Sequence, residues 1–264
     1  MSEFQSQHNV VTHFDNSAHV YYSWYTMLNS DGHSFRIRRT RCLELLQSLK
    51  TGAKIADIGC GPATFIDELL KAGFNVLATD IAPHMIEDGR ARFIGQDKIH
   101  FEVSPAHKIP VPNASLSAIT AMGLLEYLNE EDAVYTEMHR ALEIGGRAII
   151  TYPHIWSPTR LWAKYTYIFL KPFVKMARKI LNKKIPNEGV KHREYNLKHT
   201  IQQFEKAGFT VTDIVFYNFK LGFRPLDTLF PRATVWISER LEKFCRTPIL
   251  RRIGTGFILL GMKR

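Results

Sequence analysis

The sequence predicts an α/β protein with a doubly wound, mostly parallel seven-stranded sheet. Three observations support this fold class. Short apolar runs alternate with helical patterns from about Ala53 onward, as in repeated βαβ units. The first apolar run ends in glycines where a helix begins, and the second ends in an acidic residue. Strands that alternate with helices form parallel sheets, because each crossover returns the chain to the same edge.

The predicted elements follow one another in a regular order. Strands are predicted at residues 54–59, 74–80, 99–104, 115–122 and 145–152, and nearer the C-terminus at 209–219 and 254–263. Helices are predicted at residues 64–73, 83–93, 129–146 and 199–208. For the helix at 129–146 we expect Asn129 as the N-cap and Gly145 just past the end, where these residue types are favoured.

The chain divides into a core and its elaborations. Its 264 residues, 45% of them hydrophobic and 23% charged, predict one large globular domain. We expect an N-terminal helical cap (1–50), a βαβ core (51–153), a basic and aromatic helical insertion (154–194) and a C-terminal completion of the sheet (195–264). A second helical insertion is expected at 221–253, and both insertions would form a lid over the sheet.

Several classes of protein are excluded by simple patterns. No stretch of about 18 apolar residues is available for a membrane-spanning helix, and no secretory signal opens the sequence. Cys42, Cys60 and Cys245 are odd in number and lack Cys-x-x-Cys spacing, which argues against a disulfide framework and a zinc ribbon. No cluster of metal ligands is spaced along the chain, so no metal is expected. We therefore expect a cytoplasmic protein, with peripheral membrane association as a further hypothesis.

The charge of the chain is unevenly distributed. Residues 1–159 hold 13 basic and 18 acidic residues, a net charge of −5, whereas residues 160–264 hold 22 and 7, a net charge of +15. This asymmetry indicates an anionic partner for the C-terminal third, such as a membrane surface, a nucleic acid, or an acidic substrate or protein.

The turn after the first predicted strand carries the strongest functional signal. Asp57, Gly59 and Gly61 lie where a strand turns into a helix, and glycines there let the backbone approach a ligand. Asp80 ends the next strand, where a carboxylate can accept hydrogen bonds from the two hydroxyls of a ribose. The fingerprint of a nicotinamide cofactor fails, because Thr64 occupies its third glycine position. The pattern therefore predicts a nucleotide-like cofactor other than NAD.

Three segments, taken in order, resemble one enzyme family. They read IADIGCGPATF (55–65), VLATDIAPHMI (76–86) and RALEIGGRAIITYPH (140–154). The chain resembles the class I S-adenosylmethionine-dependent methyltransferases from about residue 35 to 208, with gaps. Within that family it is most similar to the small-molecule group of methyltransferase type 11 and ubiquinone-biosynthesis enzymes. The resemblance implies a Rossmann-like fold, S-adenosylmethionine as cofactor and S-adenosylhomocysteine as product.

The resemblance also implies residue roles. Gly59, Cys60 and Gly61 would border the methionine part of the cofactor, and Asp57 would order their turn. Asp80 would bind the ribose. The remaining implied cofactor contacts are Ile81 and Met85 against the adenine, Ala106 beside it, Met122 near the sulfonium, and Tyr21 in an N-terminal segment that closes over the cofactor.

The sequence departs from the family pattern at a few positions. Ser104-Pro105-Ala106 stand where the group has Gly-Asp-Ala, whose Asp meets the adenine amino group. The amide of Ala106 remains available to the ring, so the amine needs another acceptor or water. Ala63 replaces a loop glycine, and Ser117 replaces a common Asp before the fourth strand.

Candidates on the acceptor side are less distinctive. His154 and His192 are candidate general bases, since an unperturbed histidine titrates near neutral pH; the alternative for each is an ordinary solvated loop histidine. Glu126 and Tyr127 follow the fourth strand, where the family often contacts its acceptor, although Glu126 equally suits a helix start. Tyr195 is a further candidate acceptor contact.

The segment 160–184 joins the charge asymmetry to a functional hypothesis. It holds eight basic residues, no acidic residue and several aromatic residues, a pattern typical of an amphipathic helix on anionic lipid. A basic face on a substrate lid is the alternative. We expect a methyltransferase acting on a hydrophobic or lipid-like small molecule, with O-methylation favoured. An acceptor on an acidic carrier protein and a non-catalytic binding protein remain alternatives, and nucleic acid is disfavoured because no base-methylation motif follows the fourth strand.

Overall fold

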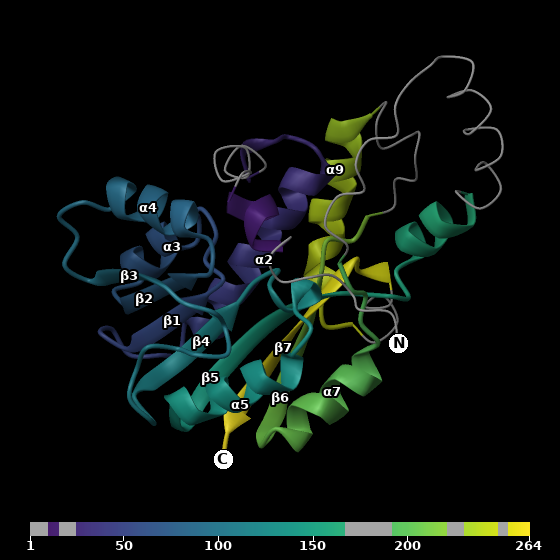
Figure 1. Cartoon of the computed structure of the whole chain (residues 1–264). Coiled ribbons are helices and arrows are strands. Elements are labelled where there is room, and N and C mark those ends of the chain that lie inside the picture. The colour runs from purple at the N-terminus through teal and green to yellow at the C-terminus, as the bar shows by residue number, and fades with distance from the viewer. Residues whose placement is uncertain (1–9, 16–24, 167–191, 221–229, 248–252) are drawn as a thin grey trace.

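The computed structural model describes residues 10–15, 25–166, 192–220, 230–247 and 253–264 (Figure 1). Seven strands form one sheet in the order β3-β2-β1-β4-β5-β7-β6. The strands are β1 (Lys54–Ile58), β2 (Asn75–Asp80), β3 (Ile99–Val103), β4 (Leu116–Ala121), β5 (Leu142–Pro153), β6 (Phe209–Tyr217) and β7 (Gly256–Lys263). All neighbours are parallel except that β7 runs antiparallel to both β5 and β6. The predicted doubly wound, mostly parallel sheet is confirmed.

Helices cover both faces of the sheet. In Figure 1, α2 (Ser30–Leu46), α3 (Ile66–Lys71) and α4 (Pro83–Arg92) lie above it, and α5 (Glu131–Ala141) and α7 (Leu197–Lys206) lie below it. Burial on both faces explains the composition of the central strands. In β1 every residue from Ile55 to Ile58 is buried, and β4 is buried at five of its six positions. The apolar core therefore lies between the sheet and each helical layer.

The helix predicted at 129–146 is shorter than expected. Its N-cap is Glu130 rather than Asn129, and the helix ends at Ala141. Strand β5 begins at once, because the buried Leu142 pairs with Leu116 of β4. Gly145, expected just past the helix, lies with φ 77° in the irregular part of β5, where the register with β4 shifts. Pairing in the sheet has overridden the helical pattern at 142–146.

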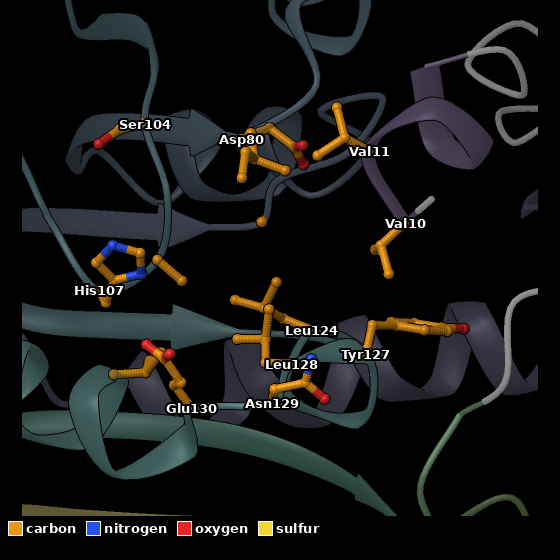
Figure 2. A pocket seen from close by; sticks show the side chains of 14 residues that line it. Val10, Val11, Asp80, Ser104, His107, Leu124, Tyr127, Leu128, Asn129 and Glu130 are labelled. Carbon is orange, nitrogen blue, oxygen red and sulfur yellow. The ribbon is translucent and has the colours of Figure 1, made fainter. Parts of the chain in front are cut away.

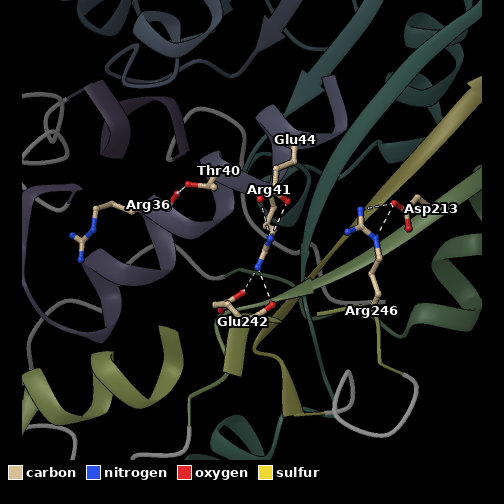
Figure 3. Close-up of polar contacts among 7 residues, drawn as sticks. All are labelled: Arg36, Thr40, Arg41, Glu44, Asp213, Glu242 and Arg246. Atoms are coloured by element: carbon tan, nitrogen blue, oxygen red, sulfur yellow. Dashed lines mark hydrogen bonds and ion pairs between the residues drawn. The ribbon is translucent and has the colours of Figure 1, made fainter. Parts of the chain in front are cut away.

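The C-terminal insertion is held by charged contacts to α2 and the sheet (Figure 3). In its described part, α9 (Pro231–Leu241) and the short 3-10 helix η2 (Glu242–Phe244) are helical, as predicted. Arg41 of α2 donates to the Glu242 carbonyl at 2.8 Å, and Glu242 Oε1 accepts the Asn218 N–H at 2.7 Å. Arg246 donates to Asp213 of β6 at 2.8 Å. These contacts fix the end of the insertion against the α2 layer.

The first insertion is described only in part. Residues 158–166 are helical, and the sequence 167–191, which carries most of the predicted basic and aromatic pattern, lies outside the described residues. In the part of the chain that the structure describes, no helix is both long and apolar enough to cross a membrane.

The strand order determines where a ligand can bind. The chain proceeds from β1 outward to β2 and β3, and then crosses to β4 on the other side of β1. In open α/β sheets, ligands bind beyond the carboxyl ends of the strands at such a switch point. The residues that follow β1, β2 and β4 therefore define the place to examine.

Candidate cofactor and acceptor site

The turn after β1 brings backbone rather than side chains to this edge. Gly59 and Gly61 have positive φ values of 65° and 52°, which glycine adopts at little cost. A Cβ on Gly59 would approach Leu124 Cδ1 to 2.7 Å, whereas one on Gly61 would meet no atom within 4 Å. Cys60 donates its N–H to the Thr79 carbonyl at 2.9 Å. The turn is therefore closely packed at Gly59 and open at Gly61.

Two arginines from separate helices hold the second half of the turn. Arg92 of α4 donates to the carbonyls of Pro62 and Ala63, at 2.8 and 2.5 Å, and Arg39 of α2 donates to the Thr64 carbonyl at 2.6 Å. Ala63 has φ 53°. Ala63 therefore adopts a left-handed conformation that glycine would adopt at less cost, and the arginine contacts help to stabilise it.

Asp57 lies beneath the turn and joins two strands. Its side chain is 2% exposed, and its Oδ1 accepts a hydrogen bond from Thr120 Oγ1 of β4 at 2.6 Å. Burial raises the pKa of Asp57 to about 7; the Thr120 hydrogen bond lowers it, and the nearby Asp80 raises it. Asp57 is thus a carboxyl group whose charge changes near neutral pH.

Asp80, at the end of β2, faces the turn. Its Oδ2 accepts the Gly61 N–H and its Oδ1 accepts the Ala82 N–H, both at 2.9 Å. Each carboxylate oxygen has room for a second hydrogen bond. Burial raises the pKa of Asp80, while the backbone hydrogen bonds lower it. The carboxylate is therefore fixed in place and retains acceptor capacity toward the space above the sheet.

Two adjoining hollows occupy that space. One, of about 740 Å³ including its open mouth, lies between Asp80–Ile81, Ser104–His107 and Leu124–Glu130 (Figure 2). The other, of about 720 Å³, lies between the turn after β1 and the segment after β4. Val10, Gly59, Asp80, Ile81, Leu124, Tyr127 and Leu128 line both hollows. Together they form one elongated site along the carboxyl edge.

The described residues predicted to bind the cofactor all line this site. They are Asp57, Gly59, Cys60, Gly61, Asp80, Ile81, Met85, Ala106 and Met122. Tyr21 lies outside the described residues. The Gly-rich turn, the end of β2 and the ends of β3 and β4 therefore meet as expected from their places in the sheet.

The acceptor candidates after β4 occupy the wall and the space behind it. Tyr127 lines both hollows. Glu126 is 6% exposed and lines neither hollow; its Oε2 has no hydrogen-bond partner. Burial raises the pKa of Glu126, and the Arg38 guanidinium of α2 lowers it. Arg38 also lies behind Gly123, where an added Cβ would approach Arg38 Nη1 to 2.7 Å.

The other acceptor candidates lie apart from the two hollows. His154 is buried, with Nδ1 3.2 Å from the Gly254 carbonyl, and burial lowers its pKa. His192 lies in a separate surface hollow, with Nε2 3.1 Å from Arg160 Nη1. Tyr195 donates to Glu131 Oε1 at 2.9 Å in the core. The structure does not bring these three side chains together with the cofactor candidates.

Sequence reasoning missed two groups of residues in this site. Leu124 and Leu128 form much of one wall, and Val10 and Phe14 approach from the N-terminal segment 10–15. Isolated apolar residues in a loop carry no local signal. The helical segment 10–15 is too short for its periodicity to predict what it covers. Among the described residues, no group of three or more potential metal ligands is assembled.

Comparison with known proteins identifies the domain. Residues 55–146 match the family model described as "Methyltransferase domain". The chain is 29% identical over 138 residues to a demethylmenaquinone methyltransferase of Clavibacter sepedonicus, covering 52% of this chain and 55% of that protein. It is 24% identical over 102 residues to a ubiquinone biosynthesis O-methyltransferase of Xanthomonas oryzae pv. oryzae, covering 38% and 43%. The chain thus spans about half the length of the curated relatives it matches.

A solved structure extends the likeness of fold to most of the chain. The S-adenosylmethionine-dependent methyltransferase from Mesorhizobium loti superposes with a TM-score of 0.56 at 17% identity, covering 86% of this chain and 98% of that one. The family match includes the turn after β1 and the end of β2, where the cofactor candidates gather. By the methyltransferase-domain match over residues 55–146 and by the order of its sheet, the chain is similar to the class I S-adenosylmethionine-dependent methyltransferases.

Proposed function

We propose that this protein transfers a methyl group from S-adenosylmethionine to an oxygen of a hydrophobic, lipid-like small molecule, at or near a membrane surface. The position of the Asp80 carboxylate is the observation that carries the assignment of S-adenosylmethionine as cofactor. Its carboxylate is held by two backbone N–H groups at the edge of a roomy site, with acceptor capacity left for a ribose diol. The open backbone at Gly61 suits the approach of the methionine part of the cofactor.

Ser104 can provide the hydrogen-bond acceptor for the adenine amino group that the sequence otherwise lacks. Its hydroxyl donates to the Lys108 carbonyl, so the lone pairs of its oxygen remain available. Ser104 and Ala106 line the same hollow as Asp80 and Ile81. We therefore assign the exocyclic amine of adenine to the Ser104 oxygen, one residue before Pro105, which stands at the position of the family's Asp.

The chemistry asked of the chain is mainly one of positioning. When bound, the cofactor supplies an electrophilic methyl group on a sulfonium. Met122, Leu124 and Phe65 line the hollow beside the turn after β1, where they would exclude water and hold the acceptor in line. Tyr127 presents an aromatic face suitable for a cationic sulfur. A hydroxyl acceptor must also lose a proton, and the two predicted general bases, His154 and His192, lie outside both hollows.

Two observations support a lipid-like acceptor: the apolar lining of the second hollow and the names of the curated relatives. Phe14, Tyr25, Met85 and Leu128 make much of the second hollow apolar, which favours a hydrophobic ligand. The curated relatives named above act in menaquinone and ubiquinone biosynthesis, by their names, and one is named an O-methyltransferase. A hydrophobic acceptor agrees with the wall and with both names, and O-methylation agrees with the second name.

Exposed aromatic side chains favour membrane contact. Trp162 and Tyr165 of the helical segment 158–166 are 48% and 58% exposed, and Trp236 of α9 is 58% exposed. The guanidinium carbon of Arg240 lies 5.2 Å from the centroid of that indole ring. Tryptophan beside a basic residue is characteristic of surfaces that contact anionic lipid.

Titration of S-adenosylhomocysteine tests the cofactor assignment. We expect calorimetry to show binding by the wild-type protein and a loss of about 100-fold in affinity for Asp80→Ala, because two charge-assisted hydrogen bonds disappear. Asp97→Ala is the matched control, since Asp97 is exposed and remote from the site. Wild-type affinity in Asp80→Ala, or no binding by folded wild-type protein, would overturn the cofactor assignment.

Vesicle co-sedimentation tests the membrane assignment separately. We expect the protein to pellet with vesicles that contain anionic phospholipid and not with purely zwitterionic vesicles, and Trp236→Ser to pellet less. Val103→Ser removes another exposed apolar side chain and serves as control. Equal recovery with both vesicle types, or salt-sensitive binding to an acidic carrier protein alone, would contradict the membrane proposal.

A further inference from the structure

The helical segment 10–15 covers the proposed cofactor site. Val10 lines both hollows, Val11 lines the hollow beside Asp80, and Phe14 lines the hollow beside the turn after β1. Figure 2 shows Val10 and Val11 across the cavity from His107, between the Asp80 side and the Leu124–Tyr127 side. The segment therefore bounds the site from a direction that the sheet leaves open.

Phe14 contacts both walls of the site. It packs against Ala82 and Met85 at the start of α4. On the opposite wall, its ring meets the Tyr127 ring edge to face, with centroids 5.0 Å apart. A side chain that bridges the two walls ties the position of the segment to the width of the site.

Asp15 attaches the same segment to α4. The N-cap of α4 is Ala82, which has no side-chain capping bond, and Pro83 follows it. Asp15 supplies the missing cap from 69 residues away: its Oδ1 accepts the His84 N–H at 3.0 Å. Its Oδ2 lies 2.6 Å from His84 Nδ1. The start of α4 thus gains a side-chain cap from segment 10–15.

We propose that Asp15 is a positioning residue for the cofactor, and that its cap on α4 closes segment 10–15 over the site most tightly when His84 is protonated. This inference rests on the proposed cofactor function. Closing the segment and binding the cofactor favour each other, because the closed segment contributes Val10 and Phe14 to the wall. A ligand that binds only the closed form must, by linkage, also favour the capped α4.

The charges around the cap set the direction of its pH dependence. Hydrogen bonding to Asp15 raises the pKa of His84, and Glu87 and Asp88 of α4 raise it further. Burial raises the pKa of Asp15, but the bonds to His84 outweigh it, so that its pKa is lowered. The ion pair is complete between these two pKa values. Above the pKa of His84 the pair is lost, so closure weakens and cofactor affinity falls as the pH rises.

Calorimetric titration of S-adenosylhomocysteine at pH 6 and pH 8.5 tests the coupling. We expect wild-type affinity to fall about three-fold between the two pH values, because deprotonation of His84 removes the ion pair and leaves the backbone cap in place. Asp15→Asn keeps a capping oxygen but loses the ion pair, and His84→Gln also loses the ion pair alone. For both variants we expect an affinity at pH 6 near the wild-type value at pH 8.5, and a smaller change with pH. At a pH near the raised pKa of His84, binding of S-adenosylhomocysteine should also take up protons from the buffer. This uptake should be smaller in His84→Gln than in wild type.

Asp88→Asn is the matched control. It removes one negative charge near His84 but not the cap, so it should keep most of the pH dependence. Asp57 and Asp80 titrate near the site in every variant, so the comparison is the difference between each variant and wild type. Wild-type affinity and an unchanged pH profile in Asp15→Asn would overturn this inference while leaving the cofactor site intact. Failure of the cofactor proposal is distinct, because wild type would then not bind at either pH.

Discussion

The two halves of the site are built in different ways. On the cofactor side, Asp57, Gly59 and Asp80 belong to two neighbouring strands and the turn between them, and they meet within about twenty-five residues of sequence. On the acceptor side, Tyr127, His154 and His192 come from separate elements and point to separate places. The difference teaches that the sheet itself positions the cofactor groups. The acceptor groups depend on the packing of insertions that the sheet does not specify.

A substitution in the turn after β1 tests how tightly the cofactor side is built, with an effect second only to that of Asp80→Ala. Gly59→Ala should lower affinity for S-adenosylhomocysteine at least about ten-fold, because its Cβ would push Leu124 into the site and also strain a positive φ. Gly145→Ala is the control, since its φ is also positive but a Cβ there meets no atom within 4 Å. Equal affinities for the two variants in calorimetry would mean that Leu124 does not define the wall.

The pH dependence of stability sharpens the same comparison. Asp57 binds a proton more tightly in the folded protein, with a pKa of about 7, than in the unfolded chain. Between about pH 4 and pH 7 the folded protein therefore holds more protons on Asp57 than the unfolded chain does. The contribution of Asp57 to the free energy of unfolding falls as the pH rises through that window. Thermal melts from pH 5 to pH 8 should show a flatter profile for Asp57→Asn than for wild type. The profile of Asp97→Asn should follow that of wild type. If the profile of Asp57→Asn also ran parallel to that of wild type, the raised pKa of Asp57 would be contradicted.

A substitution on the acceptor side should separate stability from cofactor binding. His154 packs against the rings of Phe216 and Phe257, with centroids 5.3 and 5.9 Å away. His154→Ala should lower the free energy of unfolding by about 2 kcal/mol through the lost packing. Affinity for S-adenosylhomocysteine should stay within about two-fold of wild type. Denaturant unfolding and calorimetry check the two parts, and a large loss of affinity would place His154 in the cofactor site.

The smallest expected effect concerns Tyr195. Its hydroxyl donates to Glu131 Oε1, which also accepts from Arg193 at 2.8 Å. Tyr195→Phe should cost about 1 kcal/mol of stability, the value of one buried hydrogen bond. Tyr165→Phe alters an exposed tyrosine and should leave unfolding by urea unchanged. A neutral Tyr195→Phe would show that Arg193 alone satisfies Glu131.

The contrast explains how far the sequence could predict the molecule. The strands and the cofactor candidates follow from local patterns, because an apolar run, a glycine turn and a terminal acid are all short-range signals. The end of α5 was predicted too late, since Leu142 is committed to β4 by pairing that the helical pattern does not record. Leu124 and Phe14 could not be predicted as wall residues, because their roles depend on chain segments distant in sequence.

The antiparallel β7 has a consequence for how the protein is made. β7 lies between β5 and β6 and is the last strand in chain order. Lys263 at its end donates to the carbonyls of His139 and Leu142, at 2.6 and 2.8 Å. On the ribosome, β6 therefore leaves the exit tunnel before the strand that joins it to the sheet exists. The β1–β4 region can pair while synthesis continues, but β5 and β6 keep unpaired edges until β7 emerges, and chaperones would have the most to protect during that interval.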